Sequence, residues 1–195
     1  MFTGIIQVTA QIRSVVKIND VLRVRLERPR GWVLAIGQSI AVDGVCSTVI
    51  AFDEDSFEVE YMQETLAKTT VGSFQEGMIA NLERSLTLRD RIDGSIVQGH
   101  VDATGKVEMV LVLGETKEMN ISFPSEFGKY IAPKGSIVVN GVSLTVVDTT
   151  KEAFHIALIP HTLEQTNLGV LTEGDAVNIE VDMLARYVVN ALEQK

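Results

Sequence analysis

Two residues that could act in catalysis, a thiol and a hydroxyl, stand at matching places in two similar segments of the chain. Cys46 lies two residues after the turn glycine Gly44, and Ser143 lies two residues after Gly141. A thiolate is a strong nucleophile, and a thiol or hydroxyl beside a strand end can donate a proton or a hydrogen bond to a ligand. The same positions also fit a structural interpretation, because turn hydroxyls often bond the nearby backbone and most cysteines are buried and inert.

The two segments belong to a long internal repeat. Residues 39–83 match residues 136–180 at a constant offset of 97 without a gap, and seven of the first eleven pairs are identical. A period this long indicates a duplicated domain rather than a solenoid. Alternation along a strand places a threonine of each copy, Thr48 or Thr145, on the face of the thiol or hydroxyl. The sequence therefore predicts two similar pockets with different chemistry.

A histidine begins the second half of the chain much as an apolar residue begins the first. His100 follows Gly99, which matches Gly4 at an offset of 95. Imidazole is the side chain best suited to proton transfer near neutral pH, although a lone histidine on a strand is more often structural. Both interpretations stay open on spacing alone.

The elements that must position these residues are mostly short antiparallel strands. Apolar and polar residues alternate with a period of two, and Gly-containing turns recur at the spacing of a small barrel or sandwich. About six strands in each half favour a closed barrel, because closure removes exposed strand edges. The predicted strands are 5–15, 21–26, 57–61, 97–112, 118–123 and 154–158, and the predicted helical pieces are 64–68, 125–131 and 161–165.

The last segment breaks the β pattern and has no counterpart in the first copy. Asp182 is a good N-cap residue, and an apolar stripe with helical spacing follows it. Such a helix must cover either its own domain or a neighbouring subunit, and the second is the prediction here. The stripe consists of Met183, Leu184, Tyr187, Val188, Ala191 and Leu192.

Length and composition fit two globular domains. The chain has 195 residues, of which 46% are apolar and 22% are charged, as is usual for soluble proteins. The expected domains are residues 1–92 and 93–181, followed by a helix at 182–195, with the linker near 88–93.

Charge and cysteine content exclude several classes of function. A net charge of −9 offers no basic surface for nucleic acid. A single cysteine excludes an intrachain disulfide and a cysteine-based metal cluster, and it suits a reducing cytosol. The start does not resemble a signal peptide and no apolar run approaches about 18 residues, so we expect a cytoplasmic protein without membrane contact.

Signals for common mechanisms are also missing from the sequence. It contains no nucleotide-phosphate loop, zinc-protease helix or hydrolase nucleophile elbow. Three histidines are too few and too scattered for a convincing zinc site, so no metal is expected.

Seven segments in order resemble the riboflavin synthase family over the whole chain. This resemblance implies two tandem, homologous six-stranded antiparallel Greek-key barrels, each holding one pteridine, and a C-terminal helix that builds a homotrimer. Besides the opening Met1-Phe2-Thr3-Gly4-Ile5-Ile6, the segments are 44–49, 64–66, 97–102, 134–137 with 141–146, 159–164 and 178–182.

The resemblance also implies a set of site residues, taken over position by position. The implied catalytic or functionally sensitive residues are Phe2, Cys46, His100, Ser143 and Asp182. The implied first pocket contains Gly4, Ile5, Ile6, Ser39, Cys46, Thr48, Glu60, Met62, Thr65, Gly99, His100 and Val101, with Ser47, Tyr61, Gln63 and Glu64 beside them. The implied second pocket contains Lys134, Ser143, Thr145, Ile159, Pro160, Thr162 and Asp182, with Leu144, His161, Leu163 and Glu164 beside them.

The implied reaction is the dismutation of two molecules of 6,7-dimethyl-8-ribityllumazine. A four-carbon unit passes from one molecule to the other, giving riboflavin and 5-amino-6-ribitylaminouracil without a cofactor. The productive pair of pockets is expected from different subunits, and lumazine synthase is a candidate partner.

Two departures from the family pattern leave alternatives open. Many relatives have a histidine where this chain has Ser95, and Ser47 stands where leucine is usual. A polar residue at the position of Ser47 also occurs in related lumazine-binding fluorescent proteins, which bind a chromophore without catalysis. The alternatives are therefore a non-catalytic lumazine or flavin carrier and a structural β-protein without a ligand.

Overall fold

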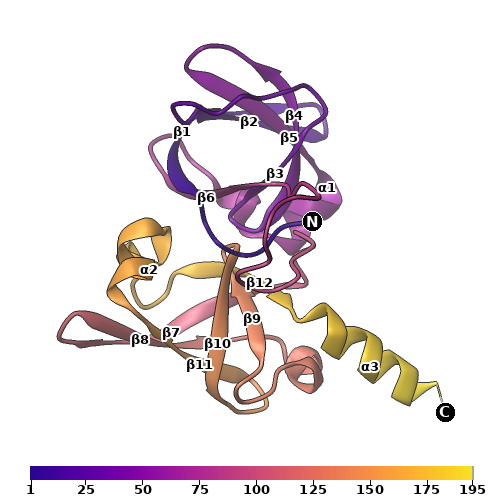
Figure 1. Ribbon diagram of the computed structural model, residues 1–195, viewed down its shortest axis with the longest axis vertical. Helices are drawn as coiled ribbons and strands as arrows, with labels where there is room; N and C mark the ends of the chain where they lie inside the picture. The colour runs from indigo at the N-terminus through magenta and orange to yellow at the C-terminus, as the bar shows by residue number, and fades with distance from the viewer. Residues whose placement is uncertain (195) are drawn as a thin grey trace.

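Twelve strands form two closed barrels, one from each half of the repeat, in the computed structural model, which describes residues 1–194 (Figure 1). Both barrels have the same Greek-key strand order, so the predicted fold class is confirmed. The first barrel has the order β1-β2-β5-β4-β3-β6, from β1 (Val8–Ile18), β2 (Val21–Glu27), β3 (Ser39–Val42), β4 (Val45–Phe52), β5 (Ser56–Met62) and β6 (Ile79–Arg84). The second repeats it with β7 (Ala103–Leu113), β8 (Thr116–Ser122), β9 (Ser136–Val139), β10 (Val142–Thr149), β11 (Ala153–Leu158) and β12 (Ala176–Val181).

The alternation of the sequence explains how each barrel is filled. In β2, Leu22, Val24 and Leu26 are buried, whereas the residues between them are partly exposed. The hairpin turns that begin at Asp43 and Asn140 place two successive residues at positive φ, as tight two-residue hairpins require. Gly44 and Gly141 supply the second of these residues, where glycine costs least.

Short helices interrupt both barrels at the predicted places. Helix α1 (Gln63–Lys68) and helix α2 (Pro160–Gln165) follow β5 and β11. Each is continued by a 3-10 helix, η1 (Thr70–Ser73) or η3 (Asn167–Val170), and η2 (Ser125–Tyr130) occupies the third predicted helical piece.

Two segments predicted as strand beginnings do not join their own barrels. β1 begins at Val8 rather than at residue 5, and β7 begins at Ala103 rather than at residue 97. Instead, Phe2 and Val97 pair with each other as an isolated antiparallel bridge between the barrels. The contact between the two halves is thus formed in part by residues 2–6 and 97–101, here called the crossing segments.

The barrels also meet through a buried network of amides around the two hairpin turns. Asp43 Oδ1 accepts hydrogen bonds from Asn81 N (2.7 Å) and Asn167 Nδ2 (2.9 Å). Asn81 Nδ2 donates to the Asn140 carbonyl oxygen (2.9 Å), and Asn178 Nδ2 donates to the Asp43 carbonyl oxygen (2.9 Å). These reciprocal contacts relate the two halves by an approximate twofold axis.

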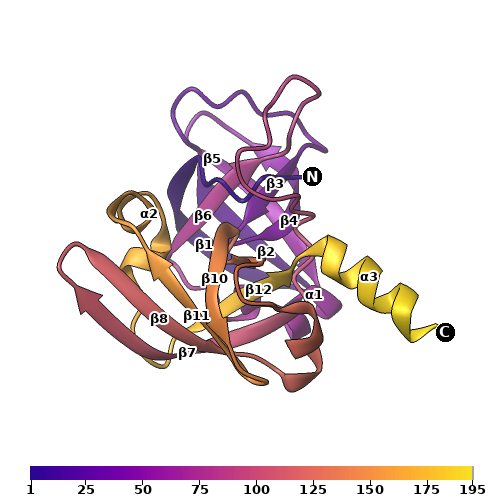
Figure 2. The same cartoon turned by 60° about the horizontal axis from the view of Figure 1, so that its bottom comes forward.

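The C-terminal helix α3 (Met183–Glu193) extends outward from the end of β12 and contacts η2, where Lys129 Nζ donates to Glu193 Oε1 at 2.6 Å (Figures 1 and 2). Asp182 caps it as predicted, with Oδ1 accepting from Leu184 N at 2.8 Å. Its base is held by Arg186, whose guanidinium donates to both carboxylate oxygens of Asp102 (2.7 and 2.8 Å). Leu184, Tyr187, Val188 and Leu192 of the apolar stripe remain about 60% exposed.

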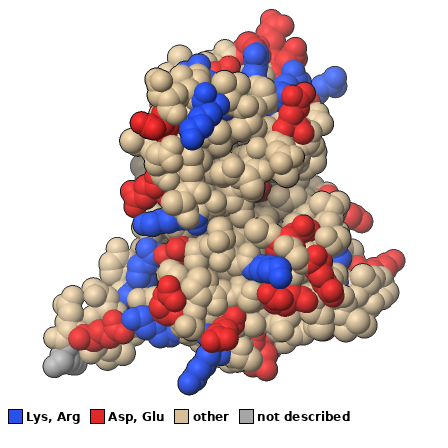
Figure 3. Space-filling model, turned by 180° about the vertical axis from the view of Figure 1, so that it is seen from behind, with Lys and Arg blue, Asp and Glu red and all other residues tan. Residues whose placement is uncertain are grey.

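The molecular surface carries both signs of charge. Lysine and arginine side chains alternate with acidic ones on the face shown in Figure 3, without a basic field. Within residues 1–194, no helix has the length and apolar character needed to cross a membrane.

Candidate active site

Cys46 and Ser143 occupy equivalent places on the outer faces of the two barrels. Cys46 on β4 lies opposite Ala41, and Ser143 on β10 lies opposite Val138. Both side chains are half-buried, whereas Ile40 and Ile137 on the neighbouring strands point inward and are fully buried. Each candidate pocket is therefore a barrel wall rather than a barrel interior.

The wall at Cys46 is completed by a crossing segment that comes from the other half of the chain. Cys46 N donates to the Gly99 carbonyl oxygen at 2.9 Å. Gly99 has φ +79°, and a Cβ at this position would lie 2.7 Å from the Cys46 Cβ. Only glycine allows this approach. Val101 then packs on the core of the first barrel, and His100 between them is exposed.

The wall at Ser143 is completed in the same way by the start of the chain. Ser143 N donates to the Gly4 carbonyl oxygen at 2.8 Å, and a Cβ on Gly4 would lie 2.6 Å from the Ser143 Cβ. Ile6 packs on the core of the second barrel. The placement of Gly4 and Ile6 in the first pocket was therefore wrong. Each crossing segment completes the pocket of the other half of the chain, so these two residues lie at the second pocket. Ile5, which is 48% exposed, belongs to the same segment.

Buried carboxylates hold both crossing segments. Glu83 accepts from Thr3 N (2.6 Å), Thr3 Oγ1 (2.7 Å) and Gly4 N (2.9 Å). Glu180 accepts from the N–H groups of residues 98, 99 and 100 at 2.7, 2.9 and 3.1 Å. Burial raises the pKa of both carboxyls, and the hydrogen bonds from the crossing segments oppose that rise.

Several predicted residues of the first pocket lie on the outer wall or its rim. Ser39 pairs with Thr48 in the β3–β4 ladder, so their side chains share the face of Cys46. Glu60 is engaged by Arg23 at 2.7 Å, and Glu64 by Lys68 at 2.9 Å. Exposed or half-buried rim residues are Met62, Gln63 and Thr65.

Three predicted binding residues point into the barrels instead. Ser47 and Tyr61 are each 2% exposed, and their hydroxyl oxygens share a hydrogen bond of 2.8 Å. Leu144, the counterpart of Ser47, packs on the second core. The side chains of these three residues therefore face away from the outer wall, because adjacent residues on a strand face opposite sides of it.

Residues around the second pocket come from a turn, from α2 and from the base of α3. Lys134 is exposed with φ +66°, and Thr145 is exposed on the face of Ser143. Asp182 is half-buried and already serves as the helix cap. Leu163 packs partly on the second core, and the other predicted residues here are Ile159, Pro160, His161, Thr162 and Glu164, all half-buried or exposed.

Phe2 does not reach either wall surface. Its ring is fully buried with Ala41, Val97 and Val138, and Cys46 packs against this cluster. Phe2 can therefore affect ligand binding only indirectly, by fixing how the two barrels pack against each other.

Two serines that the sequence interpretation did not select lie at the second pocket. Ser95 Oγ and Ser143 Oγ share a hydrogen bond of 2.6 Å, and Ser95 N donates to the Thr3 carbonyl oxygen at 2.9 Å. Ser136 pairs with Thr145, as Ser39 pairs with Thr48. The offset of 97 from Ser39 would have identified Ser136, but no spacing rule points to Ser95.

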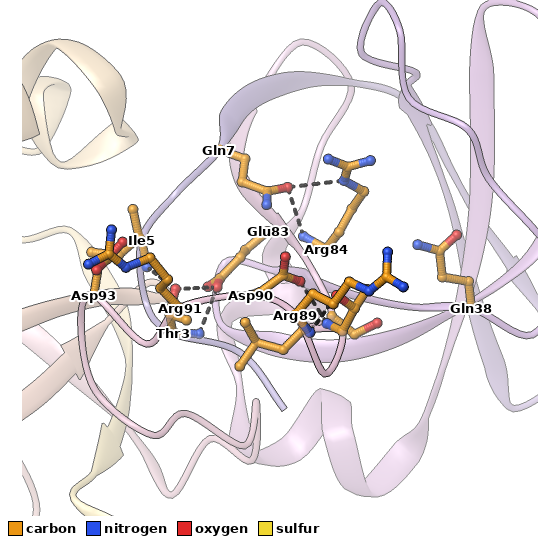
Figure 4. Close-up of a pocket in the computed structure, with 13 residues that line it drawn as sticks. Thr3, Ile5, Gln7, Gln38, Glu83, Arg84, Arg89, Asp90, Arg91 and Asp93 are labelled. Atoms are coloured by element: carbon orange, nitrogen blue, oxygen red, sulfur yellow. Dashed lines mark hydrogen bonds between the residues drawn. The ribbon is translucent and has the colours of Figure 1, made fainter.

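A cavity of about 610 Å³ lies beside the pockets but contains neither Cys46 nor Ser143 (Figure 4). Glu83 faces Thr3 at its floor, and Arg84 donates to Gln7 Oε1 at 3.2 Å. Its remaining walls come mainly from residues 85–93, which follow β6. The two barrel walls are the candidate site, because chemically reactive groups occupy equivalent positions there.

Comparison with known proteins agrees with this duplicated arrangement. The model of the family described as "Lumazine binding domain" matches twice, at residues 3–85 and 98–182. LumP in complex with riboflavin superposes with a TM-score of 0.87 at 23% identity, over 93% of this chain and 99% of LumP. That likeness shows the fold.

Curated relatives match over nearly the full length. The chain is 40% identical to riboflavin synthase of Brucella abortus, over 96% of each chain. It is 37% identical to riboflavin synthase of Actinobacillus pleuropneumoniae and 35% identical to that of Bacillus subtilis, in both cases over 100% of this chain and 91% of the relative. With two lumazine binding domains and full-length relatives at this identity, the chain belongs to the riboflavin synthase family of enzymes.

Proposed function

We propose that the two barrel walls bind two molecules of 6,7-dimethyl-8-ribityllumazine and that a four-carbon unit passes between them. The products are riboflavin and 5-amino-6-ribitylaminouracil. The carbons that one molecule loses are those that the other gains, so the reaction needs no external oxidant or reductant.

The observation that carries this proposal is the pair of equivalent but unlike walls. Cys46 and Ser143 have the same strand position, the same backbone bond to a glycine carbonyl and the same half-burial. Their side chains differ in acidity and in nucleophilicity. Two copies of one substrate must play opposite roles in a dismutation, and a duplicated site whose copies carry unlike residues meets this requirement.

The chemistry asks for proton transfer and for control of orientation. The 7-methyl group of one lumazine must lose a proton, while C7 of the other accepts a nucleophile. The Cys46 thiol, the exposed His100 imidazole and the linked hydroxyls of Ser143 and Ser95 are the groups that we assign to proton transfer and hydrogen bonding. Holding both rings in a reactive arrangement can lower the barrier by roughly 7–11 kcal/mol.

We further propose a homotrimer in which the first wall of one subunit faces the second wall of a neighbour. The exposed stripe of α3 supports this assembly, because four large apolar side chains lie there without a cover in the single chain. The half-buried Cys46 thiol suits a reducing compartment, so a cytoplasmic location is part of the proposal. An association with lumazine synthase stays a prediction.

The carrier alternative loses its main support from the sequence. The unusual Ser47 lies inside the first barrel, where it bonds to Tyr61, so it does not change the wall that would meet a ligand. Cys46, His100 and Ser143 all remain in place for catalysis.

The deciding experiment incubates the purified protein with 6,7-dimethyl-8-ribityllumazine alone. We expect riboflavin and the diaminouracil product in equal amounts, measured by chromatography. Tight binding of the lumazine without any product would instead support the carrier.

A further inference from the structure

Two glutamates in equivalent positions connect each barrel to the wall of the other. Glu83 lies on β6 of the first barrel and Glu180 lies on β12 of the second, at the repeat offset of 97. Both are only 3% exposed. Neither has a lysine or arginine partner within the described residues, and the bonds resolved for their carboxylates come from the crossing segments.

These bonds use both oxygens of each carboxylate. Glu83 Oε1 accepts from the backbone and hydroxyl of Thr3, and Oε2 accepts from Gly4. Glu180 Oε1 accepts from Gln98, and Oε2 accepts from Gly99 and His100. Charge-assisted bonds to a buried carboxylate are among the stronger hydrogen bonds in proteins.

The held residues are the ones that complete the pockets. Glu180 belongs to the second barrel, yet it fixes Gly99 against Cys46 of the first. Glu83 belongs to the first barrel, yet it fixes Gly4 against Ser143 of the second. Figure 4 shows the Glu83 carboxylate directed at Thr3 rather than at an arginine.

We propose that Glu180 and Glu83 are positioning residues that act crosswise, Glu180 setting the geometry of the Cys46 pocket and Glu83 that of the Ser143 pocket. The expected effect on turnover rests on the proposed function, whereas the positioning role rests on the hydrogen bonds alone.

Glutamine is the informative replacement because it keeps the size of the side chain. Its amide nitrogen would face a backbone N–H, so two donors would meet where a carboxylate oxygen now accepts. The segment should then move away from the wall. A misplacement of about 1 Å can lower turnover on the order of 100-fold without removing a reacting group.

The single cysteine provides a readout that does not depend on turnover. Cys46 is half-buried beneath the segment that Glu180 holds, so its alkylation by iodoacetamide reports on this wall. We expect Glu180→Gln to speed alkylation of the folded protein by about tenfold through local opening. Glu83→Gln, the matched control, should leave the alkylation rate within about twofold of wild type, since local opening at the other wall leaves Cys46 covered. In both variants kcat should fall more than KM rises.

Equal acceleration in both variants, acceleration in Glu83→Gln alone, or acceleration in neither would overturn the crosswise assignment. If Glu180→Gln does not fold, Gly99→Ala tests the same contact, because its Cβ would lie 2.7 Å from that of Cys46, and Gly4→Ala is its control. Gly99→Ala should expose Cys46 and Gly4→Ala should not, and equal rates in this pair would also overturn the assignment. A wild-type protein that forms no riboflavin would refute the proposed function while the alkylation result still decides the positioning role.

Discussion

Phe2 and Val97 each donate a backbone N–H to the carbonyl oxygen of the other, at 2.7 and 3.0 Å. This bridge lies on the approximate twofold axis and joins the two crossing segments between which the Phe2 ring is buried. The ring therefore stabilises the arrangement in which each half completes the pocket of the other.

Phe2→Ala should destabilise the protein by about 3–5 kcal/mol, as expected for removal of a fully buried aromatic ring. Urea unfolding at fixed protein concentration measures this loss, and Phe2→Leu should cost less. Riboflavin formation should fall with stability across both variants. A stable Phe2→Ala protein without activity would show instead that the ring contacts the substrate.

Cys46→Ser should lower turnover strongly while lumazine binding is largely kept. Thiol and hydroxyl are similar in size, but the hydroxyl is far less acidic near neutral pH. Fluorescence titration measures the binding and product formation measures the turnover. Full activity in the serine variant would leave Cys46 with only a packing role against Phe2 and its neighbours.

Asp43→Asn should remove a dependence of stability on pH. Burial raises the pKa of Asp43 from 3.8 to about 7, against the hydrogen bonds from Asn81 and Asn167. Between these values the folded protein holds a proton that the unfolded chain has lost, so stability falls as pH rises through this window. The second copy has Asn140 at this place, which shows that an amide fits such a turn.

The variant should therefore be more stable than wild type at pH 8, by up to a few kcal/mol, and the difference should shrink towards pH 4. Urea unfolding from pH 4 to pH 8 gives both curves. Parallel curves for the two proteins would mean that Asp43 does not titrate in this range.

Leu184→Glu combined with Val188→Glu should break the proposed trimer while leaving the subunit folded. These residues are 61% and 59% exposed in the single chain, so charge there costs little until a neighbour covers them. The variant keeps Arg186 and its bond to Asp102, unlike a deletion of 183–195. Analytical ultracentrifugation compares it with Asn190→Glu, a control outside the stripe. An unchanged trimer would show that the apolar stripe of α3 does not form the subunit contact.

Cys46→Ala and Ser143→Ala proteins, each poorly active alone, should regain activity when they are mixed and refolded. In a mixed trimer, one interface can join an intact first wall to an intact second wall from another subunit. Co-purification through two tags verifies the mixing. Verified mixed trimers without a gain in riboflavin formation would place the complete site within one chain.

The repeat and the strand pattern were sufficient to predict the barrels, the short helices and the cap at Asp182. These features follow from local alternation, turn glycines and side-chain capping, all of which the sequence displays directly. The crossing segments were missed because the predicted strands 5–15 and 97–112 extended into them. Nothing local distinguishes pairing within a barrel from pairing with the other half.

The sequence predicted which strands carry the candidate site residues, but it did not always predict which face of the strand each side chain occupies. Cys46 and Ser143 lie together with their threonines as alternation requires, whereas Ser47, Tyr61 and Leu144 were included from whole motifs and point inward. Ser95 was noted only as a departure from the family pattern, because its contact with Ser143 joins positions 48 residues apart and has no sequence signature.

The reciprocal contact of Gly44 with Gly141 has a consequence for how such an enzyme could arise. Exchange of crossing segments across a twofold axis is the geometry of an isologous dimer of single-barrel chains. In such a dimer one gene encodes both walls, so every mutation changes both of them. When the two copies are joined in one chain, each copy can mutate independently. A thiol can then be selected at one wall while a hydroxyl is kept at the other.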